Sequence, residues 1–192
     1  MTIKPIETHY AGCRFRSRLE ARWAVFFDKL GIAWEYEPQG FMIDAVLYLP
    51  DFYLPEQKLW IEVKGADPAK SDPEGYERWY AFAEKIVHFG DRAALFSGSI
   101  PTAHSLERLV DNPGNRGLKI EVFGDEGYEW CVCSSGRHFD IQHGGRNERI
   151  ECGCPGFVQG GRWLPGTDRY EPVIEEAYRA ARSARFEHGE SG

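Results

Sequence analysis

The sequence predicts an α/β protein in which helices flank a mixed central sheet, followed by a β-rich C-terminal extension. Two segments, residues 15–30 and 76–89, carry apolar and aromatic side chains at the spacing of a helix that buries one face. Several short segments alternate or are apolar throughout, as strands do. Among 192 residues, 42% are hydrophobic and 28% charged, which is typical of a globular chain and not of a disordered or fibrous one.

The N-terminal half alternates helix and strand signals. In the first helix, Leu19, Trp23, Phe26 and Leu30 recur at three- and four-residue steps, and Gly31 is a typical stop. The prolines Pro50 and Pro55 interrupt and end one extended segment. The expected strands are 34–37, 46–54, 59–64 and 93–96, and the second helix is expected at 76–89, after a loop at 65–75.

The composition changes near residue 111, where a turn-rich stretch begins. We therefore expect a core at residues 1–110 and a β-rich, cysteine-bearing extension at 111–192 that ends in a helix. A weaker helix is expected at 103–110, just before the boundary. The extension is expected to hold strands at 118–123, 128–132, 139–142 and 149–151, and a helix at 172–186.

Charge and hydropathy exclude several classes of protein. The formal net charge of −7 excludes a basic surface that grips nucleic acid everywhere, so any such contact is expected to be local or mediated by metal. No apolar run is long enough to span a bilayer, and the first residues lack the apolar core of a secretory signal. We expect a cytoplasmic protein without a membrane partner.

Two carboxylates and a lysine form the most informative pattern. Glu62 and Lys64 are two residues apart in a predicted strand, so both project from the same face. Asp51 lies in the preceding extended segment, and a turn at 55–58 can place that segment antiparallel to the strand. Asp51 and Glu62 can then meet at one end of the sheet. Two close carboxylates repel each other unless a cation lies between them, and oxygen ligands suit Mg²⁺ or Mn²⁺.

A third acid, Glu20, lies in the first helix on the stripe shared with Ala24 and Phe27, so it can face the sheet. It sits in the most basic stretch of the chain. A basic helix next to a carboxylate cluster favours contact with a phosphate backbone. The arginines nearest Glu20 are Arg14, Arg16, Arg18 and Arg22, of which Arg16, Arg18 and Arg22 are the candidate nucleic-acid contacts.

With these residues in place, the chain resembles the PD-(D/E)XK nuclease superfamily, which has the restriction-endonuclease-like fold. The resemblance covers about half the chain and leaves residues 111–192 unexplained. Residues 16–20 and 48–52 are similar to the small phage and mobile-element branch of that superfamily. The resemblance rests on Pro50-Asp51, on Glu62-Val63-Lys64, on Glu20, and on the order helix, three strands, helix, strand over residues 15–96.

The resemblance implies a Mg²⁺-dependent (or Mn²⁺-dependent) phosphodiester hydrolase, and we expect DNA to be its substrate. Asp51, Glu62 and the Val63 carbonyl would hold the metal, Lys64 would position the attacking water, and Glu20 would assist a first or second metal. Nucleases that cut both strands of a duplex often pair two sites, so a homodimer stays open.

Three alternatives remain open at this point. Glu62 and Lys64 can form a solvated strand face, with Asp51 as an ordinary turn residue. Glu20 can form an ion pair with Arg16 one helical turn away instead of serving a metal. The whole chain can also be a non-catalytic module that binds nucleic acid or recruits a protein partner on a nuclease-like fold.

The cysteines form a separate candidate metal site. The chain has five, an odd count that rules out complete internal disulfide pairing. Two Cys-x-Cys pairs, in which i and i+2 share one face of a strand, can supply four thiolates to a structural Zn²⁺. The alternative is four reduced cysteines packed as small apolar groups. The residues are Cys131, Cys133, Cys152 and Cys154, with His138 and His143 as substitutes.

Overall fold

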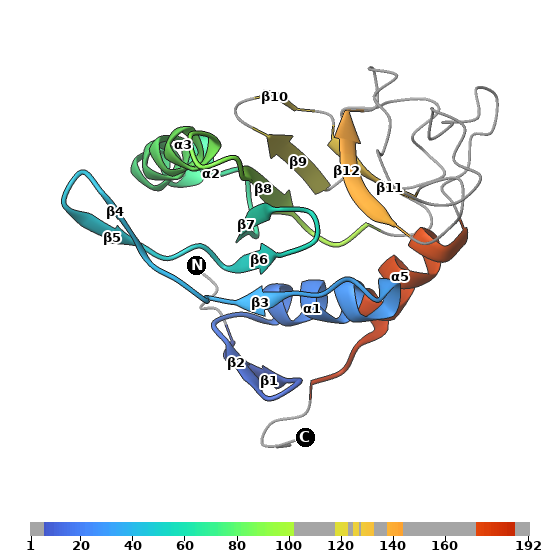
Figure 1. Ribbon diagram of the computed structural model, residues 1–192. Coiled ribbons are helices and arrows are strands. Elements are labelled where there is room, and N and C mark those ends of the chain that lie inside the picture. Colours follow the sequence, from blue (N-terminus) through green and yellow to red (C-terminus); the bar gives the residue numbers. More distant parts are fainter. Residues whose placement is uncertain are drawn as a thin grey trace, which may run out of the picture.

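The protein is a mixed α/β structure in which a twisted sheet separates two groups of helices (Figure 1). The computed structural model describes residues 6–101, 118–122, 125–126, 128–132, 138–143 and 172–186. Helices α1 (Arg18–Leu30) and α5 (Pro172–Ser183) cover one face, and α3 (Pro73–Val87) covers the other. The predicted α/β class, with helices on both faces of a mixed sheet, is confirmed.

The central sheet has the strand order β10-β9-β8-β7-β6-β3 in the described part of the chain. Strands β7 and β8 are parallel, and every other neighbouring pair is antiparallel. A parallel pair needs a long crossover, which α2 (Pro68–Ser71) and α3 supply. The strands are β3 (Glu35–Tyr36), β6 (Phe52–Leu54), β7 (Leu59–Lys64), β8 (Arg92–Gly98), β9 (Leu118–Val122) and β10 (Asp125–Glu126).

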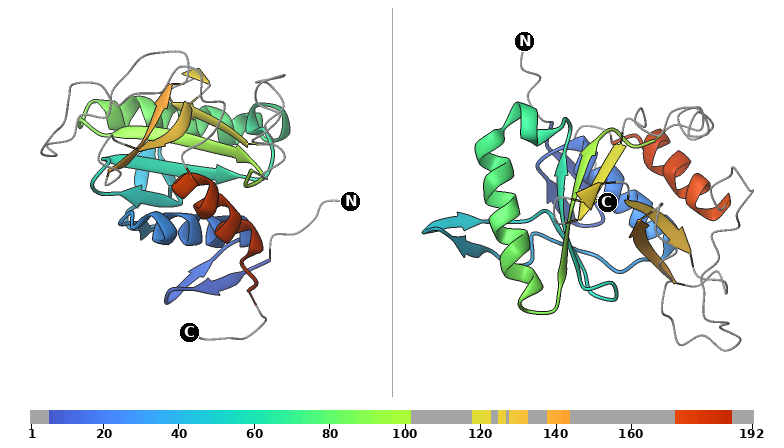
Figure 2. Two further views of the ribbon diagram at one scale, coloured as in Figure 1. Left: turned by 90° about the vertical axis from the view of Figure 1, so that its right-hand side faces the viewer. Right: turned by 90° about the horizontal axis from the view of Figure 1, so that it is seen from above.

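Among the described residues, three two-stranded hairpins lie beside this sheet. The expected extended segment at 46–54 is divided, because its first part pairs with a strand that was not expected and its second part joins the central sheet. The β4–β5 hairpin projects from the body of the molecule (Figure 2). The hairpins are β1 (Thr8–Tyr10) with β2 (Cys13–Phe15), β4 (Phe41–Ile43) with β5 (Val46–Tyr48), and β11 (Tyr128–Val132) with β12 (Phe139–His143).

Local signals set the ends of the helices. Helix α1 begins after Ser17, whose hydroxyl accepts a hydrogen bond from the Glu20 amide. The helix was expected to include residues 15–17, but these residues precede it. It ends at Gly31 in the left-handed conformation (φ +68°). The loop expected at 65–75 is partly helical, because Asp67 and Asp72 cap α2 and α3 and each is followed by a proline at the first helical position.

The main core includes residues from both sides of position 110. The ring of Trp130 on β11 lies 5.5 Å from that of Phe26 on α1, and the ring of Tyr178 on α5 lies 4.6 Å from the same phenylalanine. The part of the chain after residue 110 therefore adds β9 to the central sheet and α5 to the layer of α1. The expected helix at 103–110 and strand at 149–151 lie outside the described residues.

Across the ranges that the structure describes, every helix is too short or too polar to cross a membrane.

Candidate functional site

Asp51 is placed at the site by the antiparallel pairing of β6 with β7. The register pairs Phe52 with Ile61, so the preceding residue of β6 meets the following residues of β7, as the turn at 55–58 predicted. Asp51 Oδ2 accepts a hydrogen bond of 2.6 Å from the Val63 amide. Asp51 is only 3% exposed, so it is a buried residue of the bend that leads into β6.

Glu62 and Lys64 project together from β7, as their spacing predicted. The Lys64 ammonium lies 2.6 Å from Glu62 Oε1, and the Tyr48 hydroxyl donates to Glu62 Oε2 at 2.8 Å. Glu62 is only 5% exposed, so the alternative of a solvated strand face is wrong for this residue. Lys64 keeps 38% of its side chain exposed and can therefore reach a ligand from the solvent side.

Glu20 is buried in the first turn of α1, where its carboxylate accepts hydrogen bonds from the residues just before the helix. Its Oε1 accepts from the Ser17 hydroxyl at 2.6 Å. Its Oε2 accepts from the Arg16 amide at 3.0 Å and from the Tyr36 hydroxyl at 2.6 Å. Both oxygens thus have protein partners, which connect the carboxylate to the start of α1 and to β3. The alternative ion pair with the Arg16 guanidinium is absent.

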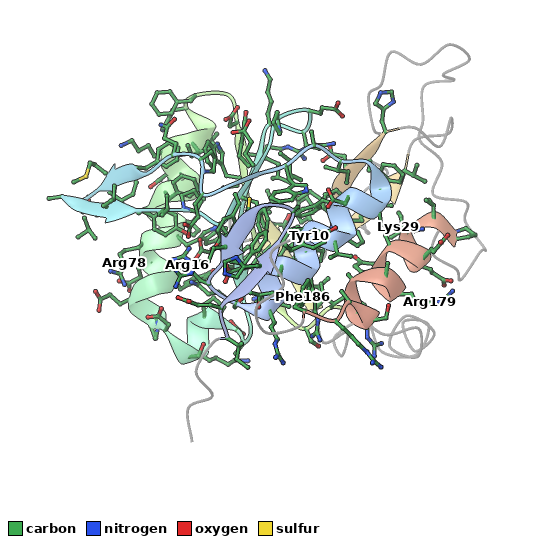
Figure 3. All side chains as sticks on the ribbon, turned by 90° about the horizontal axis from the view of Figure 1, so that it is seen from below. Tyr10, Arg16, Lys29, Arg78, Arg179 and Phe186 are labelled. Atoms are coloured by element: carbon green, nitrogen blue, oxygen red, sulfur yellow. The ribbon has the colours of Figure 1, made fainter. Side chains whose placement is uncertain are left out.

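The Arg16 guanidinium pairs with two other acids. One terminal nitrogen lies 2.8 Å from Asp51 Oδ1, and Nε lies 2.7 Å from Glu37 Oε1. Arg16 sits beside the β1–β2 hairpin where α1 begins (Figure 3). Glu37 has φ +47°, an unusual conformation for a residue with a side chain, and its amide donates to the Asp51 carbonyl at 2.9 Å.

The electrostatics of the site are dominated by negative charge in a buried place. Burial, followed by the charges of Glu62 and Glu20, raises the pKa of Asp51 well above its usual value, although the Val63 amide and Arg16 oppose the shift. Burial is the largest influence on the pKa of Lys64 and lowers it, but the charges of Glu62 and Asp51 and the hydrogen bond to Glu62 together raise it above its usual value, so Lys64 stays an ammonium. Burial and Glu62 also raise the pKa of Tyr48, which keeps its hydroxyl a donor.

The donor set of this site fits a hard divalent cation. Two buried carboxylates, Asp51 and Glu62, face the same strand end, and the mutual repulsion expressed in the Asp51 pKa is what a cation would relieve. No group of three or more His, Cys, Asp or Glu side chains within the described ranges is arranged to hold a metal. Mg²⁺ needs no such group, because it keeps several waters and takes only one or two carboxylates.

The arginines predicted to contact nucleic acid differ in whether they form ion pairs with acids of the protein. Arg16 is held by acids, and Arg14, outside the predicted set, pairs with Glu7. Arg18 and Arg22 lie half-buried on α1, and neither forms an ion pair among the described residues. The basic stretch is therefore partly neutralised by the protein itself.

The predicted zinc site lies largely outside the described residues. Cys131 is half-buried on β11, opposite Asp140 of β12, and His138 is exposed just before β12. Cys133, Cys152 and Cys154 are outside the described ranges, and of His143 only the strand position is described.

Three further residues touch the predicted site. Tyr48 contacts Glu62, Tyr36 contacts Glu20, and Glu37 contacts Arg16. No spacing rule connects them to these partners, because each partner comes from a separate segment. The one available signal was position: Tyr36 and Glu37 shortly precede the β4–β5 hairpin, and Tyr48 ends it, just before Asp51.

Comparisons with known protein families, curated proteins and solved structures found no match to this chain.

Proposed function

We propose that this protein is a metal-dependent nuclease that hydrolyses phosphodiester bonds in DNA, built on a restriction-endonuclease-like core. One observation carries the proposal: Asp51 Oδ2 lies 2.6 Å from the Val63 amide, inside the Glu62-Val63-Lys64 segment. A short hydrogen bond thus joins the two halves of the predicted motif, which are separated by a turn in the chain. The shared strand end holds two buried acids and one half-exposed ammonium group.

Asp51, Glu62 and the Val63 carbonyl are the groups that would hold Mg²⁺. When bound, the metal would supply Lewis-acid stabilisation of a phosphoryl oxygen and lower the pKa of a bound water. Glu20 would act from a distance, because both its oxygens already cap α1 while its charge still acts on Asp51. Tyr48 would orient Glu62 through its hydrogen bond of 2.8 Å.

Lys64 has a defined role in this proposal. Its raised pKa keeps it protonated, and an ammonium group has three donors and no acceptor. It therefore cannot take a proton from the attacking water. It can hydrogen-bond that water or a phosphate oxygen and stabilise the negative charge that develops on the phosphoryl group. Glu62, 2.6 Å away, keeps the ammonium in place.

DNA is the proposed partner because the site faces the start of the basic helix. Arg18 and Arg22, which form no ion pair within the described ranges, are the residues we propose for phosphate contact. The net charge of −7 means that such contact must be confined to this patch.

The test is cleavage of supercoiled plasmid and branched DNA with Mg²⁺ or Mn²⁺. We expect Asp51→Asn and Glu62→Gln to lower the rate by about a hundredfold or more, since each removes a charged metal ligand at nearly constant shape. Lys64→Met is expected to cost about 10²–10³ in rate, the usual cost of losing a transition-state donor.

Matched controls come from exposed residues of the same kind. Asp44→Asn changes an acid in the β4–β5 turn (φ +47°), a conformation that asparagine tolerates, and Lys70→Met changes the exposed lysine of α2. Both are expected to cut DNA at the wild-type rate. Wild-type protein that binds DNA and Mg²⁺ without cutting any of these substrates would instead indicate the non-catalytic binding module.

A further inference from the structure

Both oxygens of Asp51 already have partners. Oδ2 accepts from the Val63 amide at 2.6 Å, and Oδ1 accepts from the Arg16 guanidinium at 2.8 Å. The amide belongs to a central strand and cannot move without breaking the sheet. Oδ1 is therefore the oxygen through which Asp51 can meet a cation, and in this structure that cation is Arg16.

The Arg16 side chain is exposed enough to move away from Asp51 Oδ1. That side chain is 56% exposed, whereas that of Asp51 is 4% exposed, so the arginine can swing toward solvent and the aspartate cannot. Its Nε is separately held by Glu37 at 2.7 Å. Losing the contact with Oδ1 would therefore leave the guanidinium tethered at the edge of the site and not released into solvent.

We propose that Arg16 is a built-in competitor for the divalent metal: its guanidinium occupies Asp51 Oδ1 in the metal-free protein, and metal binding displaces it. The inference rests on the proposed function, because it takes Asp51 as a metal ligand. A guanidinium and a divalent cation on the same oxygen repel each other, because both are positively charged and the carboxylate that they would share is buried. The displaced guanidinium, still on Glu37, is then free to meet a substrate phosphate.

If Arg16 competes with the metal, removing Arg16 should raise the affinity of the site for the metal. Removing a residue with a merely structural role weakens a metal site, whereas removing a competitor strengthens it. We expect Arg16→Met to bind Mn²⁺ at least tenfold more tightly than the wild type, measured by calorimetry or by electron paramagnetic resonance at pH 8 and fixed ionic strength. The binding measurement needs no DNA and no cleavage.

Arg14→Met is the matched control. It removes the same charge two residues away, from an exposed side chain that pairs with Glu7 and has no contact with Asp51 among the described residues. We expect its Mn²⁺ affinity to stay within twofold of wild type. Equal tightening in Arg16→Met and Arg14→Met would overturn the proposal, because the effect would then come from general charge and not from occupation of Oδ1.

A second variant, Arg16→Lys, keeps the inference testable if Arg16→Met does not fold. Arg16→Lys keeps the charge, but an ammonium group cannot hold Glu37 and Asp51 in the forked geometry of a guanidinium. We expect it to remain folded by circular dichroism and to bind Mn²⁺ several-fold more tightly than wild type.

Failure of this inference differs from failure of the proposed function. If wild-type protein binds Mn²⁺, Asp51→Asn does not, and neither Arg16 variant binds more tightly, Arg16 is no competitor while the metal site stands. If wild-type protein binds no Mn²⁺ at millimolar concentration, the proposed function falls and this inference falls with it.

Discussion

At the scale of single residues, the burial of Asp51 affects the stability of the candidate site. Asp51 is buried at 3% exposure between Glu62 and Glu20, and the net effect is a pKa well above the ordinary value of an aspartate. A raised pKa means that the folded protein favours the neutral carboxyl over the ionised one. The ionised form that the proposed metal would require is thus destabilising while no metal is bound, a feature common at functional sites.

This has a consequence for the pH dependence of stability. Below about pH 3.9, the ordinary aspartate pKa, Asp51 is protonated in both states. As the pH rises from there to the raised folded pKa, the unfolded chain loses the proton first, so the free energy of unfolding falls. We expect metal-free Asp51→Asn to lack this fall, measured by urea unfolding from pH 4 upward.

The control for this experiment is Asp44→Asn, which should retain the wild-type slope because Asp44 lies exposed in a turn. An identical slope in wild-type and Asp51→Asn protein would show that ionisation of Asp51 does not cause the fall in the free energy of unfolding.

At the scale of elements, α1 connects the core to the site. Its buried face packs Trp23, Phe26 and Phe27 into the core, while its first turn holds Glu20, whose amide donates to the Ser17 hydroxyl. The helix end is set by Gly31 at φ +68°. A shift of α1 along its axis would therefore disturb the core and the site together.

Gly31→Ala tests the helix end. A Cβ at this position would meet no atom within 4 Å, so the cost is the left-handed backbone alone. We expect the free energy of unfolding to fall by about 1 kcal/mol, measured by urea unfolding. Gly65→Ala is the control, since a Cβ there also meets nothing and its backbone is not left-handed; it should change stability by less than about 0.5 kcal/mol. An equal loss of unfolding free energy in Gly31→Ala and Gly65→Ala would contradict the explanation by the left-handed backbone of Gly31.

At the scale of the whole molecule, the later part of the chain belongs to the main core. Trp130, which is buried on β11, packs against Phe26 and Phe27 of α1 and against Phe96 of β8. Lys29 of α1 pairs with Glu176 of α5. Figure 3 shows Lys29 at the end of α1, on the side where α5 lies. Folding of the site-bearing half should therefore depend on the half that follows residue 110.

Trp130→Ala is expected to destabilise the whole molecule in one transition. Removing a buried tryptophan costs about 3–5 kcal/mol, and the lost contacts reach both α1 and β8. Urea unfolding followed by circular dichroism and by Mn²⁺ binding should give coincident curves. Phe89→Ala, at a side chain 71% exposed, should leave the curve nearly unchanged. Loss of the later part alone, with Mn²⁺ binding retained, would indicate two independent units.

Much of the fold was predictable where the signal is local. The predicted strands at 59–64 and 128–132 are confirmed with the same ends, because two-residue alternation and flanking turns are properties of a short segment. The β1–β2 and β4–β5 hairpins were missed. Their strands have three residues each, too few for a period to emerge, and two of the turns use Ala11 and Ala45 with positive φ, which composition does not signal.

The sequence by itself determined the pairs whose geometry is local: Glu62 with Lys64 on one strand face, and Asp51 with Glu62 across a short turn. Only the tertiary structure decided the partners that come from distant segments: Arg16 on Asp51, Tyr48 on Glu62, and the late strand β9 beside β8. The physical reason is that backbone periodicity sets the direction of a side chain within its own element. Which elements then approach one another depends on how the whole core packs.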